Sequence, residues 1–193
     1  MRYYTDAAPT YVGSGSGGQN RYLAHFMSKV APGSRVLDLG CGGAVDAAAM
    51  LDCGLMVDAT EGSPSLAAVA SKRLRGKVSI MRFDELDAVE IYDAVWASAS
   101  LIHVPRVALS PVLARVYAAL KPGGIHFATY KSGGSEGRDS VGRYYNYPSA
   151  DELRTFYARS AAWDIALIED YVGGGFEAGK GPWLAIEAYR KRQ

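Results

Sequence analysis

The sequence predicts an α/β fold built on one doubly wound, mostly parallel sheet. Three observations support this fold class. Short apolar runs alternate with helical patterns through residue 161, a glycine-rich turn follows the first run, and two strand-like stretches with no helix between them end the chain. Alternating strands and helices form a parallel sheet. The last two strands pair antiparallel as a hairpin, which gives seven strands in all.

Apolar runs and turn signals place the elements in order. Strands are expected at residues 35–39, 55–60, 77–83, 92–98, 125–130, 164–172 and 183–189. Helices are expected at 20–31, 43–53, 63–74, 110–120 and 149–161. Ser110 is expected to cap the fourth helix with Pro111 at its first position, since proline is favoured there. Ser149 and Glu152 have the spacing of a capping box at the last helix.

Length and composition favour one globular domain. The chain has 193 residues, 49% of them hydrophobic and 21% charged, and a net charge of +1. Because the basic residues are dispersed, nucleic acid is not an expected partner. No run approaches the ~18 apolar residues of a membrane span, and the N-terminus lacks an apolar signal segment. A cytoplasmic protein is therefore expected, and no feature indicates its oligomeric state.

The cysteines and histidines do not predict a metal site. Cys41 and Cys53 are far apart, and the three histidines are dispersed, whereas zinc ligands occur at short fixed spacings. Cys41 follows the first strand, where the N-terminus of the next helix would lower the pKa of its thiol. Residues 1–20 contain a run of Gly and Ser, so they are expected to form a flexible N-terminal lid before a single domain of residues 21–193.

The glycine-rich turn after the first strand predicts a nucleotide-type ligand. Gly40 and Gly42 allow the backbone to approach a ligand closely, and the following helix presents free N–H groups. Glu61, at the end of the second strand, is expected to accept hydrogen bonds from ribose hydroxyls. The alternative is a carboxylate that stabilises the N-terminus of the third helix. Val45 occupies a position where a dinucleotide fingerprint needs a small residue.

Asp38, Gly40, Gly42 and Ala44 resemble motif I, D-x-G-x-G-x-G, of the class I S-adenosylmethionine-dependent methyltransferases, with alanine at the third glycine. The stretches 92–96 and 120–124 are similar to the family's fourth strand and to the L-x-P-G-G before its fifth. The resemblance implies a Rossmann-like sheet of order 3-2-1-4-5-7-6. It also implies S-adenosylmethionine as cofactor, S-adenosylhomocysteine as product, and in-line methyl transfer to a small-molecule acceptor.

Two further segments resemble one subgroup of this family. Residues 82–86 and 99–105 are similar to bacterial methyltransferases grouped with tellurite resistance, although this label does not identify tellurite as the substrate. Residues 4–11 are similar to a segment with which many small methyltransferases cover their cofactor.

The resemblance also implies a set of cofactor-binding residues. They come from the lead-in, the glycine turn and the ends of the next three strands: Tyr11, Arg21, Asp38, Gly40, Cys41, Gly42, Glu61, Gly62, Ser63, Phe83, Asp84, Ala97 and Ser98. Asp38 would face the ammonium group of the methionine moiety. Arg21 is either a partner of its carboxylate or a solvated helix residue. Phe83 either packs on adenine or belongs to the core, and Asp84 or Glu85 would bind the adenine amino group.

The acceptor side is expected after the fourth and fifth strands. His103 is either a general base, because a neutral imidazole can take a proton at physiological pH, or a structural residue. Tyr130 and Lys131 are expected to face the acceptor pocket, with Arg138 and Arg143 in the following loop. These cations would suit an anionic acceptor, or they are solvated loop charges.

Two other functions compete with methyl transfer. A module that binds the cofactor without turnover would explain Ala44 in motif I and the absence of an evident catalytic pair. A nicotinamide oxidoreductase is disfavoured by Val45 and by the terminal hairpin.

Overall fold

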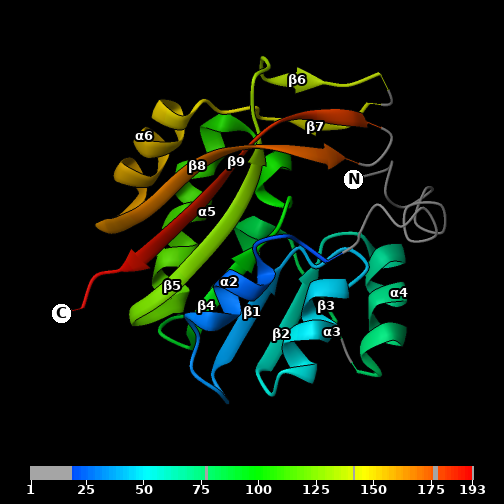
Figure 1. Cartoon of the computed structure of the whole chain (residues 1–193). Helices are drawn as coiled ribbons and strands as arrows, with labels where there is room; N and C mark the ends of the chain where they lie inside the picture. The colour runs from blue at the N-terminus through cyan, green and yellow to red at the C-terminus, as the bar shows by residue number, and fades with distance from the viewer. Residues whose placement is uncertain (1–18, 77, 141, 176–177, 193) are drawn as a thin grey trace.

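The computed structural model describes residues 19–76, 78–140, 142–175 and 178–192. Its main sheet has seven strands in the order β3-β2-β1-β4-β5-β9-β8 (Figure 1). These strands are β1 (Arg35–Leu39), β2 (Met56–Glu61), β3 (Ser79–Ile80), β4 (Tyr92–Ala97), β5 (Leu120–Lys131), β8 (Trp163–Gly175) and β9 (Ala178–Arg190). The first five run parallel, and β9 pairs antiparallel with both β5 and β8. The predicted fold class and strand order are confirmed.

Helices cover both faces of the sheet. They are α2 (Leu23–Ser28), α3 (Val45–Asp52), α4 (Pro64–Leu74), α5 (Arg106–Ala119) and α6 (Ala150–Ser160), with short 3-10 helices η1 (Phe83–Glu85) and η2 (Leu101–His103). The buried side chains of α5 and α6 pack on one face, and α5 and α6 lie side by side (Figure 1). Those of α2 and α3 pack on the other face around Trp96, whose ring stacks 5.2 Å from that of Phe127.

The fourth predicted helix begins earlier than expected, and the predicted Ser110–Pro111 start is wrong. α5 begins at Arg106, and Pro111 lies inside it. Arg106 fixes the extra turn, because its guanidinium group donates to the carbonyl oxygens of Asn146 and Tyr147 at 2.8 Å. Proline inside a helix removes one backbone hydrogen bond, here the bond to the carbonyl of Val107, a highly exposed residue.

The third strand is shorter than predicted, and one hairpin was missed. Only two residues of β3 pair with β2, because the chain turns at Arg82. There the Glu85 carboxylate accepts the Arg82 N–H at 2.7 Å and starts η1. Between β5 and α6 the structure forms the antiparallel pair β6 (Gly137–Arg138) and β7 (Tyr144–Tyr145), where a loop was expected. The predicted capping box of Ser149 and Glu152 is present at α6.

Candidate functional site

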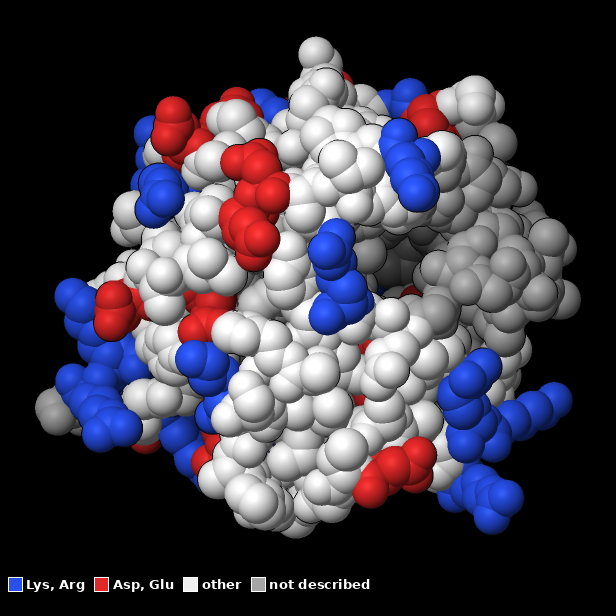
Figure 2. Space-filling model, in the orientation of Figure 1, with Lys and Arg blue, Asp and Glu red and all other residues white. Residues whose placement is uncertain are grey.

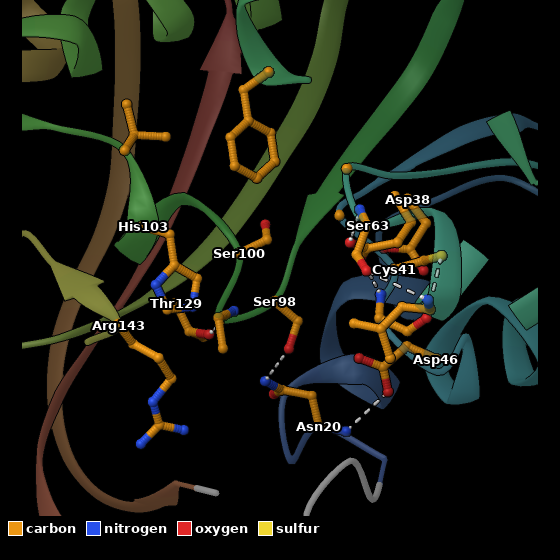
Figure 3. Close-up of a pocket in the computed structure, with 18 of the residues that line it drawn as sticks. Asn20, Asp38, Cys41, Asp46, Ser63, Ser98, Ser100, His103, Thr129 and Arg143 are labelled. Atoms are coloured by element: carbon orange, nitrogen blue, oxygen red, sulfur yellow. Dashed lines mark hydrogen bonds between the residues drawn. The ribbon is translucent and has the colours of Figure 1, made fainter. Parts of the chain in front are cut away.

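A cleft of about 1520 Å³ lies at the carboxyl ends of the parallel strands, where ligands bind in sheets of this kind. Figure 2 shows it as a hollow in a face over which acidic and basic side chains are dispersed. Residues after β1, β2 and β4 line one end, and residues of the β6–β7 segment and the end of β8 line the other. Figure 3 shows side chains of both ends facing each other across the cleft.

The glycine turn after β1 has backbone conformations that favour glycine. Gly40 has a φ of +83°, and a Cβ there would lie 2.6 Å from the Cβ of Ser100. Gly42 has a φ of +54°, and Ala44, the N-cap of α3, has a φ of +57°. The left-handed conformation costs a residue with a Cβ about 1–2 kcal/mol. Ala44, at the position of the third glycine of motif I, therefore keeps the left-handed backbone conformation that a glycine would have there.

Asp38 is a buried carboxylate that faces this turn. Its side chain is 2% exposed, and its Oδ2 has no hydrogen-bond partner within the described part of the chain. Burial, reinforced by the nearby carboxylates of Asp46 and Glu61, raises the pKa of Asp38 well above its usual range. A buried carboxylate of this kind is stabilised by a cation. The residues present therefore fit the ammonium group of an amino acid moiety.

Glu61 lies at the start of α4, as one of the two roles considered from the sequence requires, and it also lines the cleft. Its Oε1 accepts the N–H of Ser63, the N-cap of α4, at 2.8 Å, and its Oε2 accepts the N–H of Gly42 at 3.0 Å. The carboxylate thus joins the glycine turn to the start of α4 while lining the cleft. Each carboxylate oxygen can accept more than one hydrogen bond, so Glu61 can still accept from ligand hydroxyls. Gly62 and Ser63 line the same wall.

A hydrogen-bonded network near the start of α3 was not predicted. Asp46, in the first turn of α3, accepts the backbone N–H of Asn20 and the indole N–H of Trp96, each at 2.9 Å. The Asn20 amide donates to Ser98 Oγ at 2.9 Å (Figure 3). Burial raises the pKa of Asp46. The network joins α3 and β4 to the residues just before α2, and only the position of Asp46 at a helix N-terminus was visible in the sequence.

Phe83, a residue expected near adenine, lines the cleft and also packs against the core. Asp84 lines the cleft, but its two carboxylate oxygens accept from Arg82 at 3.0 and 2.9 Å. Glu85 caps the Arg82 backbone. Ser100 was not predicted; its hydroxyl is buried in the cleft wall with no partner among the described residues. It is therefore a better candidate than Asp84 for a polar contact to a ligand.

Two of the residues predicted to bind the cofactor differ from expectation. Burial raises the pKa of the Cys41 thiol, and the carboxylates of Asp38 and Glu61 raise it further. The predicted lowering by the helix N-terminus is wrong, and the thiol stays protonated. Ala97 is fully buried and does not line the cleft, whereas Ser98 does.

Arg21 lies at the cleft with its guanidinium carbon 5.4 Å from the ring centre of Tyr171. Tyr11 lies outside the described residues, as do the first 18 residues of the predicted lid. Gln19 and Asn20, the last residues of that segment, line the cleft.

His103 lines the acceptor end from η2. Its Nδ1 lies 2.7 Å from the carbonyl oxygen of Tyr144, and its ring centre lies 4.9 Å from that of Tyr145. Burial lowers the pKa of His103 to about 4, against the opposing effect of the Tyr144 carbonyl. The imidazole is therefore neutral at physiological pH. Because Nδ1 faces a carbonyl, it carries the proton, and Nε2 is the basic nitrogen.

Tyr130 and Lys131 do not line the cleft, so their predicted place in the acceptor pocket is corrected. Tyr130 is fully buried in the core, and Thr129 faces the cleft in its place, with its Oγ1 accepting the Ala99 N–H at 2.9 Å. Successive strand residues point to opposite faces, so an error of one residue reverses the assignment of Tyr130. The Lys131 ammonium group lies 4.5 Å from the ring centre of Tyr145.

Arg138, Arg143 and Tyr144 line the acceptor end, as the sequence suggested for this loop. The Arg143 Nε donates to Asp139 Oδ2 at 2.7 Å, and the hydroxyl of Tyr144 bonds to Glu136. The positive charge of Arg143 is therefore partly neutralised by the Asp139 carboxylate. Within the described ranges, no group of His, Cys, Asp and Glu side chains could hold a metal ion. None of the described helices is both long and apolar enough to cross a bilayer.

Comparisons with known proteins agree with this geometry. Residues 36–124 match a family model described as a methyltransferase domain. The ubiquinone biosynthesis O-methyltransferases of three Xanthomonas campestris strains are 36% identical over 115 residues, which cover 54% of this chain and 46% of theirs. The chain thus spans about half the length of the curated relatives that it matches.

Solved structures share the fold at low sequence identity. A Methanosarcina mazei S-adenosylmethionine-dependent methyltransferase superposes with a TM-score of 0.78 at 15% identity, covering 88% of this chain and 98% of that one. The Burkholderia thailandensis 1,6-didemethyltoxoflavin-N1-methyltransferase, with S-adenosylhomocysteine bound, superposes with a TM-score of 0.76 at 22% identity, covering 98% and 84%. Residues 36–124 therefore resemble a methyltransferase domain, within a chain that shares the fold of solved S-adenosylmethionine-dependent methyltransferases.

Proposed function

We propose that the protein transfers the methyl group of S-adenosylmethionine to a small-molecule acceptor and leaves S-adenosylhomocysteine. The observation that carries the proposal is Asp38, a buried carboxylate with an unpartnered oxygen beside a turn whose glycines allow close approach. The match of residues 36–124 to a methyltransferase domain supports it independently.

The chain's own residues would hold the cofactor by its two polar ends. Asp38 would bind the ammonium group, and the Asn20–Asp46–Ser98 network would form the wall beside it. Glu61 would accept hydrogen bonds from the ribose hydroxyls while staying oriented by the N–H groups of Gly42 and Ser63. When bound, S-adenosylmethionine supplies an activated methyl group on a sulfonium. We also propose residues 1–20 as the lid that excludes water from this cleft.

His103 is the proposed base for the acceptor. Its Nε2 is expected to take the acceptor's proton as the methyl group arrives, while Nδ1–H stays bonded to the Tyr144 carbonyl. Methyl transfer needs mainly correct positioning of donor and acceptor. A base with a pKa of about 4 is weak, so it suits an acceptor whose own proton is fairly acidic, such as a phenol. The curated relatives are named O-methyltransferases, which also favours an oxygen acceptor.

Two narrower assignments are part of the proposal. We group the chain with the bacterial tellurite-resistance-like methyltransferases on residues 82–86 and 99–105. We also propose a cytoplasmic location, because Cys41 and Cys53 are both free thiols and free thiols are typical of reducing compartments.

A cofactor-binding module without turnover is the second candidate. It is suggested by Ala44 in motif I, and the same fold does occur in a protein with another reaction, the [4+2]-cyclase SpnF, which superposes with a TM-score of 0.72 at 17% identity. A shared fold does not determine the reaction.

The test is release of S-adenosylhomocysteine from S-adenosylmethionine by the purified protein with a panel of phenols, carboxylates, amines and thiols. Product formed with one acceptor class, and lost in His103→Gln, would support the methyltransferase. Binding of S-adenosylhomocysteine with no turnover across the panel would favour the module. No binding would reject both.

A further inference from the structure

Asn146, just after β7, is fully buried and joins the β6–β7 segment to η2, the short helix that carries His103. Its backbone N–H donates to the Ile102 carbonyl at 2.9 Å. Its side-chain amide donates to the carbonyls of Leu101 at 2.8 Å and Val104 at 3.1 Å. Both side-chain partners are acceptors, which determines the orientation of the amide. One residue therefore satisfies three carbonyl groups that flank His103 on both sides.

The same segment holds the imidazole ring. The Tyr144 carbonyl accepts from Nδ1 at 2.7 Å, and the Tyr145 ring lies against the imidazole at 4.9 Å between ring centres. Residues 144–146 thus contact the side chain of His103 and the backbone of the residues on either side of it. The helix η2 has only three residues, and its backbone bonds, His103 N–H to Ser100 O at 3.2 Å and Val104 N–H to Leu101 O at 3.1 Å, are long. Helices of this kind are weakly held by their own hydrogen bonds.

The segment is itself anchored to the rest of the fold. Arg106 donates to the carbonyl of Asn146 and pairs with the Glu152 carboxylate at 2.6 Å in α6. The Oδ1 of Asn146 is buried with no partner among the described residues. A buried unpaired oxygen lowers stability, so stability alone does not account for an asparagine here.

We propose that Asn146 is a positioning residue for His103, which fixes η2 so that Nδ1 meets the Tyr144 carbonyl and Nε2 is presented to the acceptor. The proposal rests on the role of His103 in the proposed function. It assigns the β6–β7 segment two tasks, since the same segment contributes Arg138, Arg143 and Tyr144 to the acceptor end of the cleft. The segment that contacts the acceptor would therefore also be the one that orients His103.

The proposal predicts a spectroscopic signature of His103 that does not depend on turnover. Burial is the largest cause of the lowered pKa of His103, and the positive charges of Arg143 and Lys131 lower it further. Loss of the Asn146 amide should loosen η2 and admit water. The pKa of His103 should then rise from about 4 toward its ordinary value of about 6.5. The ring should also populate both neutral tautomers.

The experiment is nitrogen-15 NMR of the histidine side chains in the full chain, which has three histidines; the signals of His103 are those missing from His103→Gln. Wild type is expected to show a neutral Nδ1–H tautomer at pH 7. Asn146→Ala is expected to show the raised pKa and mixed tautomers. The matched control is Ser110→Ala, which removes a hydrogen bond of similar length, from Oγ to the Phe156 carbonyl at 2.9 Å, between α5 and α6. This control should leave His103 unchanged.

The wild-type spectrum keeps the proposal falsifiable even where Asn146→Ala fails to fold. An Nε2–H tautomer in wild type would overturn it, and so would a folded Asn146→Ala variant with wild-type His103 signals. Calorimetric titration separates it from the proposed function, since Asn146→Ala should keep the dissociation constant for S-adenosylhomocysteine within about twofold of wild type. Lost binding in Asn146→Ala, with unchanged His103 signals, would mean that the residue supports the cofactor site instead.

Discussion

The two ends of the cleft differ in their buried oxygens, although both contain bonded side chains, such as Asn20 and Ser98 at the cofactor end. At the cofactor end, Asp38 and Ser100 present buried oxygens without partners in the described chain, beside left-handed backbone at Gly40. At the acceptor end, side chains are bonded to one another, as in the pair Arg143–Asp139. Figure 3 shows His103 and Arg143 across the cleft from Asp38. Substitutions at the first end should therefore change cofactor affinity, and those at the second should change turnover.

The largest expected effect is on turnover in His103→Gln. Loss of a general base typically slows a reaction by about 10²–10⁴-fold, and affinity for S-adenosylhomocysteine should stay unchanged. Because the pKa of His103 is about 4, its imidazole is deprotonated above that pH. Protonation of His103 should therefore lower the wild-type rate only as the pH drops toward 4. Initial rates of S-adenosylhomocysteine release against pH test this. Equal losses of rate and affinity would contradict the division between the two ends.

The next effect is on affinity in Asp38→Asn. Removing the charge that pairs with an ammonium group should raise the dissociation constant for S-adenosylhomocysteine about 100-fold, which equals about 2.7 kcal/mol. Asp58→Asn is the control, because Asp58 also lies on a strand but forms an exposed pair with Arg35. Calorimetric titration measures both, and comparable losses in the two variants would refute a specific role for Asp38.

Asp38→Asn should also stabilise the protein without ligand. The folded-state pKa of Asp38 is raised, so the folded state binds the proton more tightly than the unfolded state. Wild type therefore loses stability as the pH rises above the unfolded value of about 3.9. The variant avoids this loss, and its free energy of unfolding should exceed that of wild type at pH 7 but not at pH 3. Urea unfolding at the two pH values checks the sign.

A smaller effect is expected in Glu61→Ala. The variant would lack the carboxylate that is proposed to contact the ribose, and the N–H groups of Gly42 and Ser63 would lose their acceptor. The dissociation constant for S-adenosylhomocysteine should rise about tenfold, equivalent to about 1.4 kcal/mol, which is near the low end for one hydrogen bond to a charged group. Titration with methionine alone, which lacks a ribose, is the control. The affinity of Glu61→Ala for methionine should stay close to that of wild type. Unchanged affinity for S-adenosylhomocysteine would show that Glu61 does not bind the cofactor.

The smallest effect is expected in Ala44→Gly, which restores the third glycine of motif I. Glycine would relieve about 1–2 kcal/mol of left-handed strain, but it would lose a fully buried methyl group and add freedom to the unfolded chain. These contributions nearly cancel. Thermal unfolding and affinity for S-adenosylhomocysteine should stay close to wild type, and a large gain in affinity would show that Ala44 impairs the site.

The sequence predicted what short-range patterns determine. The glycine turn, the end of the second strand at Glu61 and the capping box at Ser149 depend on neighbouring residues, and their positions agree with the structure. The start of α5 depends on contacts of Arg106 with residues about 40 positions away. Asp46 has partners 26 and 50 residues away. Pattern reasoning does not reach such pairs.

The acceptor side was harder to predict, because alternate residues of a strand face opposite sides of the sheet and the sequence did not show which residues of the fifth strand face the cleft. Tyr130 and Thr129 are adjacent, and only the pairing of β5 with β4 and β9 determines which of them faces the cleft. The β6–β7 hairpin was missed for a related reason. Its two-residue strands are held by contacts with the turn that carries His103, such as those of Asn146, and not by an apolar alternation of their own.

The measurement that tests the central claim most directly is calorimetric titration of the full chain with S-adenosylhomocysteine. We predict one site with a micromolar dissociation constant, equivalent to about 8 kcal/mol, and a heat signal that is greatly weakened in Asp38→Asn. Absence of binding to the wild-type chain, or equal binding in the variant, would contradict the account of the cleft as a cofactor site built on Asp38.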